Sequence, residues 1–183
     1  KLYNKINSIY SLPNVKDAGN PLDYYTKIMS YLNYNILKIL NITVDSSYAH
    51  DKNNLINLLE NKLINNDFVY DLIIVEDHES GYIHKQEYEL TKNNIKYKYV
   101  LDSIIITNKD HYNPNANSHF VSVLTINKSE YKFDGSSYSK LSKFDWKHMI
   151  NTNKDWTFKE NPNYYPEKYN FKFGYKMLFY YRS

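Results

Sequence analysis

The stretch Ser-His-Phe-Val-Ser-Val-Leu-Thr-Ile-Asn-Lys-Ser-Glu-Tyr-Lys-Phe-Asp-Gly, residues 118–135, decides which fold this chain is expected to adopt. Its aromatic and β-branched content predicts two strands, His119–Ile126 and Glu130–Asp134, joined by a tight turn near Asn127-Lys128. Two antiparallel strands hold the start of one beside the end of the other. The histidine that begins the first strand and the aspartate that ends the second are therefore predicted to lie in contact.

The N-terminal third predicts helices. Asn20-Pro21 resembles a helix start, with Asn as the cap and Pro at the first helical position. Three- and four-residue spacing of apolar side chains predicts one long helix from about Pro21 to Leu40. A second helix is expected from a cap at Asp51 to Ile64. The apolar residues that define the first helix are Leu22, Tyr25, Met29, Leu32, Ile36 and Leu40.

The remaining chain predicts more strands, and the whole predicts an α+β fold. Strands are expected at Phe68–Glu76, Lys98–Thr107 and Phe173–Tyr181, and a short helix at Phe144–Ile150. Helices that precede antiparallel strands indicate one domain, residues 1–183, with two lobes. The helical lobe is expected at about 1–66 and the β-rich lobe at about 67–183.

Composition narrows the class of protein. The 183 residues carry a net charge of +3 with the signs interspersed, which argues against a nucleic-acid groove. No apolar stretch approaches the roughly 18 residues of a membrane span. The charged segment Glu76–Glu79 is expected to be a solvated turn, and the histidines lack metal-ligand spacing, so no metal or other cofactor is expected.

Cysteine is absent from the sequence. One interpretation is a cytosolic protein without disulfides or cysteine-bound zinc. The other is that a catalytic cysteine has been replaced. Alanine occurs at only three positions, and Ala18, at the start of the predicted long helix, is where such a cysteine would be.

The chemistry of a thiol nucleophile explains why that position matters. The N-terminus of a helix presents unpaired N–H groups and the positive end of the dipole, which favour a thiolate. A neighbouring histidine, here His119, would accept the proton and return it to the leaving amine. An acid, here Asp134, would orient the imidazole. The order of nucleophile, histidine and acid along the chain is thus compatible with cysteine-dependent acyl transfer.

These motifs, with the closing Phe173-Gly-Tyr-Lys-Met-Leu-Phe-Tyr-Tyr, resemble those of papain-like cysteine proteases. The most similar groups are viral papain-like and leader proteases and the ubiquitin-specific proteases. The resemblance implies a papain-like α+β fold, with an N-terminal helical lobe around a long central helix, a C-terminal antiparallel β lobe and a cleft between them. It also implies Ala18 at the nucleophile position, His119 as base and Asp134 as orienting acid.

The sequence departs from the family around the nucleophile. Gly19 follows Ala18 where the family carries an aromatic residue, a pattern closer to bacteriocin-leader peptidases and to some viral ovarian-tumour-type proteases. The family's oxyanion donor positions hold Leu12 and Pro13. Asn14 and Asp17 are therefore the oxyanion candidates.

Three functions stay open at this point. The first is a thiol hydrolase of peptide or isopeptide bonds, in polyprotein processing or deubiquitination, inactivated by alanine. The second is a non-catalytic papain-like module that binds a partner peptide, and the third is the leader-cleaving peptidase domain of an exporter. The expected partner is a protein or peptide substrate, including ubiquitin or a ubiquitin-like protein, for a monomer in the cytoplasm, or the host cytoplasm if the protein is viral.

Overall fold

A computed structural model describes residues 2–10, 21–32, 37–46, 54–78, 81, 83–108, 119–135, 141–158 and 167–183. The chain divides into two compact units, Lys1–Lys38 and Ile39–Ser183. In the first unit the structure describes two short helices, α1 (Leu2–Tyr10) and α2 (Pro21–Tyr31). Neither these nor the third described helix is long and apolar enough to cross a membrane.

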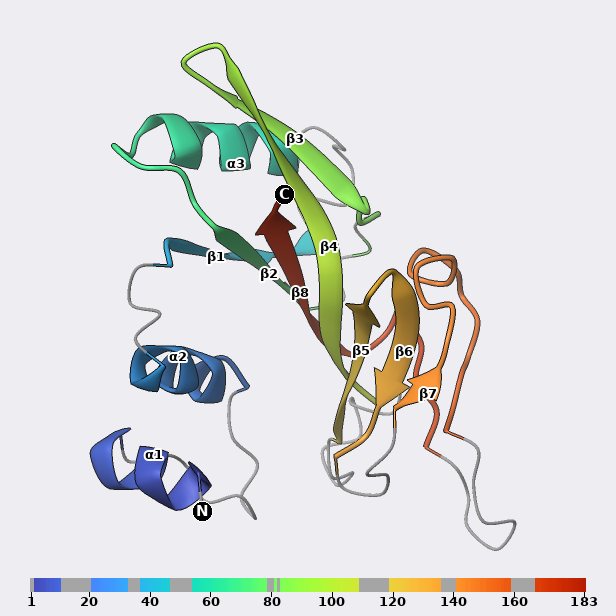
Figure 1. The fold of residues 1–183 in the computed structure, drawn as a ribbon. Helices are drawn as coiled ribbons and strands as arrows, with labels where there is room; N and C mark the ends of the chain where they lie inside the picture. Colours follow the sequence, from blue (N-terminus) through green and yellow to red (C-terminus); the bar gives the residue numbers. More distant parts are fainter. Residues whose placement is uncertain are drawn as a thin grey trace, which may run out of the picture. The chain divides into compact units, whose positions relative to one another are not determined.

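The second unit is built on one mixed sheet (Figure 1). Its main path runs β1-β2-β8-β4-β5-β6-β7, and β3 pairs with β4 beside that path. The described elements are β1 (Ile39–Val44), α3 (Asn54–Ile64), β2 (Leu72–His78), β3 (Glu87–Lys92), β4 (Ile95–Thr107), β5 (Phe120–Ile126), β6 (Ser129–Phe133), β7 (Ser142–Lys143) and β8 (Tyr175–Arg182).

Strands β1 and β2 are parallel, and the connection between them contains α3. A parallel pair needs a crossover connection, and a helix commonly supplies it. The helix turns Leu55, Leu59 and Leu63 inward at four-residue spacing, and all three are fully buried. Figure 1 shows α3 beside β3, where the Glu60 side chain accepts a hydrogen bond from the Thr91 backbone N–H at 3.1 Å.

Strand β8 lies at the centre, between β2 and β4, and is antiparallel to both. Its residues from Lys176 to Tyr180 are all buried, so both faces of this strand are covered. Strand β4 is the longest, and its other edge pairs first with β3 and then with β5. Both strands carry large buried side chains, so the paired strands β4 and β8 form the middle of the core.

Two tight turns reverse the chain with positive φ angles. Asn93 (50°) and Asn94 (62°) join β3 to β4, and Asn127 (49°) and Lys128 (65°) join β5 to β6. Two residues with positive φ match the right-handed twist of a hairpin, and asparagine tolerates this conformation better than most residues. The predicted turn near Asn127-Lys128 is confirmed, whereas the β3–β4 hairpin was not predicted from the sequence.

The predicted papain-like α+β fold is wrong. The second unit is mostly β, and the described helices are short. The helix expected from Pro21 to Leu40 ends at Tyr31, and β1 begins at Ile39. Alternate residues Leu40, Ile42 and Val44 are buried in β1, so pairing with β2 prevails over the helical spacing.

Three further expectations are also wrong, in whole or in part. The helical lobe at about 1–66 does not exist, because β1 joins the large sheet and α3 packs beside β3. The short helix expected at Phe144–Ile150 is absent: residues 144–146 are irregular, residues 147–150 form turns, and Trp146 and Ile150 are buried in the core. The antiparallel β lobe is wrong in one respect, because the pair β1–β2 makes the sheet mixed.

Gly174, at the entrance to β8, provides a test of this packing. Its φ is +77°, and a Cβ there would lie 2.6 Å from Thr107 Oγ1 and 3.1 Å from the Thr107 carbonyl oxygen. That hydroxyl already accepts a hydrogen bond from the Tyr175 N–H at 2.9 Å. We expect Gly174→Ala to lower the free energy of unfolding by about 2–4 kcal/mol in chemical denaturation.

The matched control for this substitution is Gly135→Ala. A Cβ at Gly135 would meet its nearest atom, on the Phe133 ring, at 3.6 Å, which is an ordinary contact. We expect the stability of this variant to change by less than about 1 kcal/mol. Equal effects of the two substitutions would contradict the close approach of the chain at Gly174.

Candidate functional site

His119 and Asp134 meet where the β5–β6 hairpin opens. Phe133, the last residue of β6, pairs with Ser122, so Asp134 returns beside the entrance to β5. His119 Nε2 donates a hydrogen bond to Asp134 Oδ1 at 2.8 Å. The carboxylate side chain is 7% exposed and the imidazole 26% exposed. The predicted contact between the two residues is therefore confirmed.

The end of β4 positions the backbone of the histidine. The Asn108 N–H donates to the His119 carbonyl oxygen at 3.1 Å, and the His119 N–H donates to Asn108 Oδ1 at 3.5 Å. The first paired residue of β5, Phe120, lies opposite Thr107 in the register. Asn108 itself is buried. The backbone N–H and C=O of His119 are thus both held by hydrogen bonds to Asn108, which fixes the point from which the imidazole extends.

This geometry suits acid–base chemistry. A carboxylate that accepts the Nε2 proton fixes the histidine tautomer, so Nδ1 becomes the nitrogen that can accept a proton from another group. The acid is buried and the imidazole is partly exposed, so part of the ring surface is accessible to solvent. The pair can therefore serve as a general base with its orienting acid.

The other predicted site residues lie outside the described residues. Ala18, the expected nucleophile position, and the oxyanion candidates Asn14 and Asp17 all fall in 11–20. The structure accordingly brings together the two residues of the β hairpin and leaves the N-terminal part of the predicted site as a prediction.

A second polar cluster, formed by Asp77, His84 and Lys176, was not predicted. His84 Nε2 lies 2.7 Å from Asp77 Oδ2, and Lys176 Nζ lies 3.2 Å from the same oxygen. All three residues are at most 3% exposed. The Asn151 side chain accepts a hydrogen bond from the His84 N–H at 3.1 Å and donates one to the His84 carbonyl at 2.9 Å.

The sheet register brings this cluster to the same end of the sheet as His119. Asp77 pairs with Lys176, Lys176 with Ile106, and Ile106 with Val121, which lies two residues after His119. The expectation of a solvated turn at Glu76–Glu79 is wrong, because residues 76–78 belong to strand β2 and Asp77 is buried. A lysine within the otherwise apolar run of β8 was the sequence signal for this pair, because a buried ammonium group needs a partner.

Burial controls the charge of the cluster. Desolvation lowers the pKa of His84, and the hydrogen bond and negative charge of Asp77 only partly oppose that shift. The imidazole is therefore neutral near pH 7 and donates its Nε2 proton to the carboxylate. The Asp77 carboxylate and the Lys176 ammonium form the charged pair.

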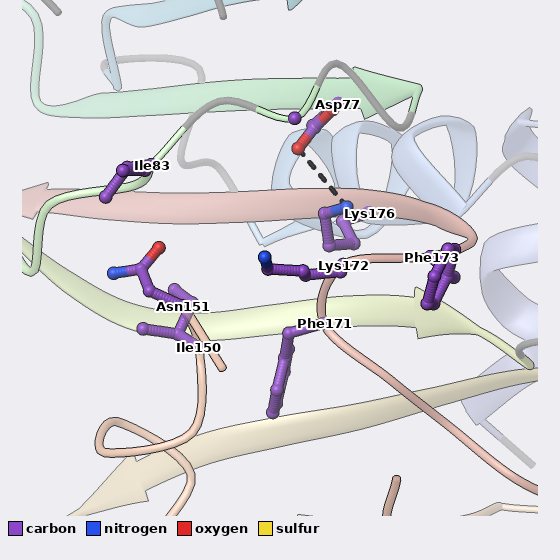
Figure 2. A pocket seen from close by; sticks show the side chains of 9 residues that line it. Asp77, Ile83, Ile150, Asn151, Phe171, Lys172, Phe173 and Lys176 are labelled. Atoms are coloured by element: carbon purple, nitrogen blue, oxygen red, sulfur yellow. Dashed lines mark ion pairs between the residues drawn. The ribbon is translucent and has the colours of Figure 1, made fainter. Parts of the chain in front are cut away.

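A pocket of about 290 Å³ opens beside this cluster (Figure 2). Asp77 and Lys176 lie on one wall, joined by their ion pair, and Lys172 extends toward Asn151. The apolar lining is contributed by Ile83, Ile150, Phe171 and Phe173. The pocket thus combines apolar walls with two ammonium groups.

Tyr175 occupies the opposite side of the same sheet end. Its hydroxyl donates to Glu76 Oε2 at 2.7 Å, and its ring centroid lies 4.6 Å from that of His78 and 6.2 Å from that of Phe120. Burial, followed by the hydrogen bond to Glu76, raises the pKa of Tyr175. The phenol therefore stays a hydrogen-bond donor and locks the start of β8 to β2.

No model of a known protein family matches the chain, and neither does any curated protein. Within the described part of the chain, no group of three or more histidine or acidic side chains has a geometry that could hold a metal ion.

The lowered pKa of His84 predicts a pH-dependent stability. Below about pH 6.5 the unfolded chain binds a proton at this histidine that the folded chain does not bind. The free energy of unfolding should therefore fall as the pH falls from 7 to 5, and His84 contributes at most about 1.4 kcal/mol per pH unit to this slope. Chemical denaturation at a series of pH values measures the slope.

Replacement of His84 measures its contribution to the pH dependence of the free energy of unfolding. His84→Gln should reduce the slope by that amount even if the variant is less stable at pH 7. The control His148→Gln changes an exposed histidine and should leave the slope nearly unchanged. A proton NMR titration in which the His84 ring becomes charged above pH 6.5 would contradict the prediction.

Proposed function

We propose that this chain is a cysteine-protease-type domain with its histidine and acid in place and with alanine at the nucleophile position. The observation that supports the proposal is the His119 Nε2–Asp134 Oδ1 hydrogen bond of 2.8 Å, between a buried acid and a partly exposed imidazole. The bond class is a peptide or isopeptide bond, and the substrate class is a protein or peptide, with ubiquitin as a candidate.

The proposed reaction needs a cysteine at position 18. Nδ1 of His119 would take the thiol proton, and the thiolate would attack the scissile carbonyl carbon, forming a C–S bond and an oxyanion. Collapse of this intermediate would break the C–N bond, and the imidazolium would protonate the leaving amine. Water would then hydrolyse the thioester, with His119 as base, and release the acid and the thiol.

Asp134 has a positioning role in this reaction. Its carboxylate holds the Nε2 proton, so the proton that moves during the reaction belongs to Nδ1. The carboxylate also stabilises the imidazolium formed in the first step. Because the chain contains no cysteine, this sequence supplies no thiol, and we expect it to bind a substrate without thiol-dependent hydrolysis.

Introduction of the thiol tests the proposal. We expect Ala18→Cys to gain a thiol that iodoacetamide alkylates at a pH well below that needed for a free cysteine, because His119 favours the thiolate. Addition of His119→Ala to this variant should slow hydrolysis of a peptide library or of linked diubiquitin by about 10²- to 10⁴-fold. Mass spectrometry follows both alkylation and cleavage.

The matched control is His148→Ala in the Ala18→Cys background. His148 also lies near an aspartate, Asp145, at 3.6 Å, but on the exposed surface, and its loss should leave both rates unchanged. Asp134→Asn should slow hydrolysis while the variant stays folded. An introduced cysteine with the reactivity of an ordinary thiol, whether or not His119 is present, would refute the protease proposal and favour a non-catalytic binding module.

A further inference from the structure

The pocket beside Asp77 and Lys176 has features of a ligand site that are independent of the His119–Asp134 pair. A lysine and an aspartate have been removed from water there, which costs several kcal/mol for each ion unless polar partners compensate. Stability alone is a weak reason to keep such a pair, since well-packed apolar residues commonly replace it without loss. The position of the pair at a pocket wall suggests a binding role.

The ammonium group of Lys176 retains hydrogen-bonding capacity. It has three N–H donors, and within the described part of the chain it contacts Asp77 Oδ2 at 3.2 Å and the Gly174 carbonyl oxygen at 3.4 Å. Both contacts are long for a charged donor. Lys176 lines the pocket, so an anionic oxygen placed there would gain a partner already free of most of its water.

A second ammonium group gives the pocket a net positive charge. Lys172 is exposed and lines the pocket, and Figure 2 shows its side chain extending along the cavity toward Asn151. Asp77 balances Lys176, and neutral His84 adds no charge. Summed over the described lining residues, the charge is thus about one positive unit, which favours a ligand with a single negative charge.

The rest of the lining is apolar. Phe171 and Ile150 are buried, and Ile83 at the rim is 55% exposed although its side chain is aliphatic. The volume of about 290 Å³ lies at the lower end of small-molecule pockets, which span roughly 300–1,000 Å³. The space therefore suits one aromatic or branched aliphatic group.

We propose that this pocket binds a small monocarboxylate with an apolar body, whose carboxylate lies between Lys172 and Lys176 and whose body contacts Phe171, Phe173 and Ile83. A free aryl or branched aliphatic acid and the C-terminal residue of a peptide share this chemistry. A phosphate monoester fits less well, because its charge of nearly two units exceeds the net charge of the pocket.

Titration of the full chain with phenylacetate tests the proposal. Amide NMR shifts and calorimetry should show saturable binding that perturbs residues 171–176 and 83–84, and the neutral phenylacetamide should bind at least about tenfold more weakly. Lys172→Gln, at an exposed position, should weaken binding of phenylacetate by about tenfold or more. Lys62→Gln, an exposed lysine on α3 that does not line the pocket, is the matched control and should bind as the parent does.

A second pair of probes distinguishes a free acid from the C-terminus of a peptide as the source of the carboxylate. The peptide Gly-Gly-Phe with a free C-terminus is compared with the same peptide amidated, and tighter binding of the peptide acid or of phenylacetate identifies the natural form of the carboxylate. The proposal is overturned by equal affinity for acid and amide, by unchanged affinity in Lys172→Gln, or by the absence of binding up to about 10 mM. None of these outcomes depends on position 18 or on His119.

Discussion

The pairing of β8 with both β2 and β4 is the interaction on which the rest of the sheet depends. The final strand enters between a parallel pair from the start of the second unit and a run of antiparallel hairpins from its middle. Without it, β1–β2 and β3–β7 would be two small sheets with unpaired edges. Because β8 is buried on both faces, its apolar residues supply the hydrophobic energy that offsets the entropy of closing such long loops.

This central pairing also decides where polar chemistry can occur. The end of β2, the start of β8, the end of β4 and the start of β5 come to one end of the sheet. The ion pair Asp77–Lys176 and the hydrogen bond His119–Asp134 both lie there, outside the apolar centre. Hydrogen bonds from strand ends, such as that of Asn108 to His119, hold these groups in a fixed backbone frame.

The two polar sites differ in the solvent exposure of their histidines. Asp134 is buried, whereas the His119 ring is partly exposed to solvent. In the other cluster burial lowers the pKa of His84, so the imidazole acts as a neutral donor that supports Asp77. The first arrangement suits proton transfer and the second suits a fixed electrostatic environment, and the proposals for catalysis and for carboxylate binding follow this difference.

The local features could be predicted from the sequence, because they depend on residues that are close together in the chain. The β5–β6 hairpin, its Asn127-Lys128 turn and the contact of His119 with Asp134 all arise within seventeen residues, counted from His119 to Gly135. Only the fold shows that Leu40, which continues the apolar spacing of the predicted helix, belongs to β1, where it pairs with Ile73 of β2. Likewise only the fold explains the burial of Asp77 beside Lys176, since the two residues lie 99 positions apart and the β2–β8 register brings them together.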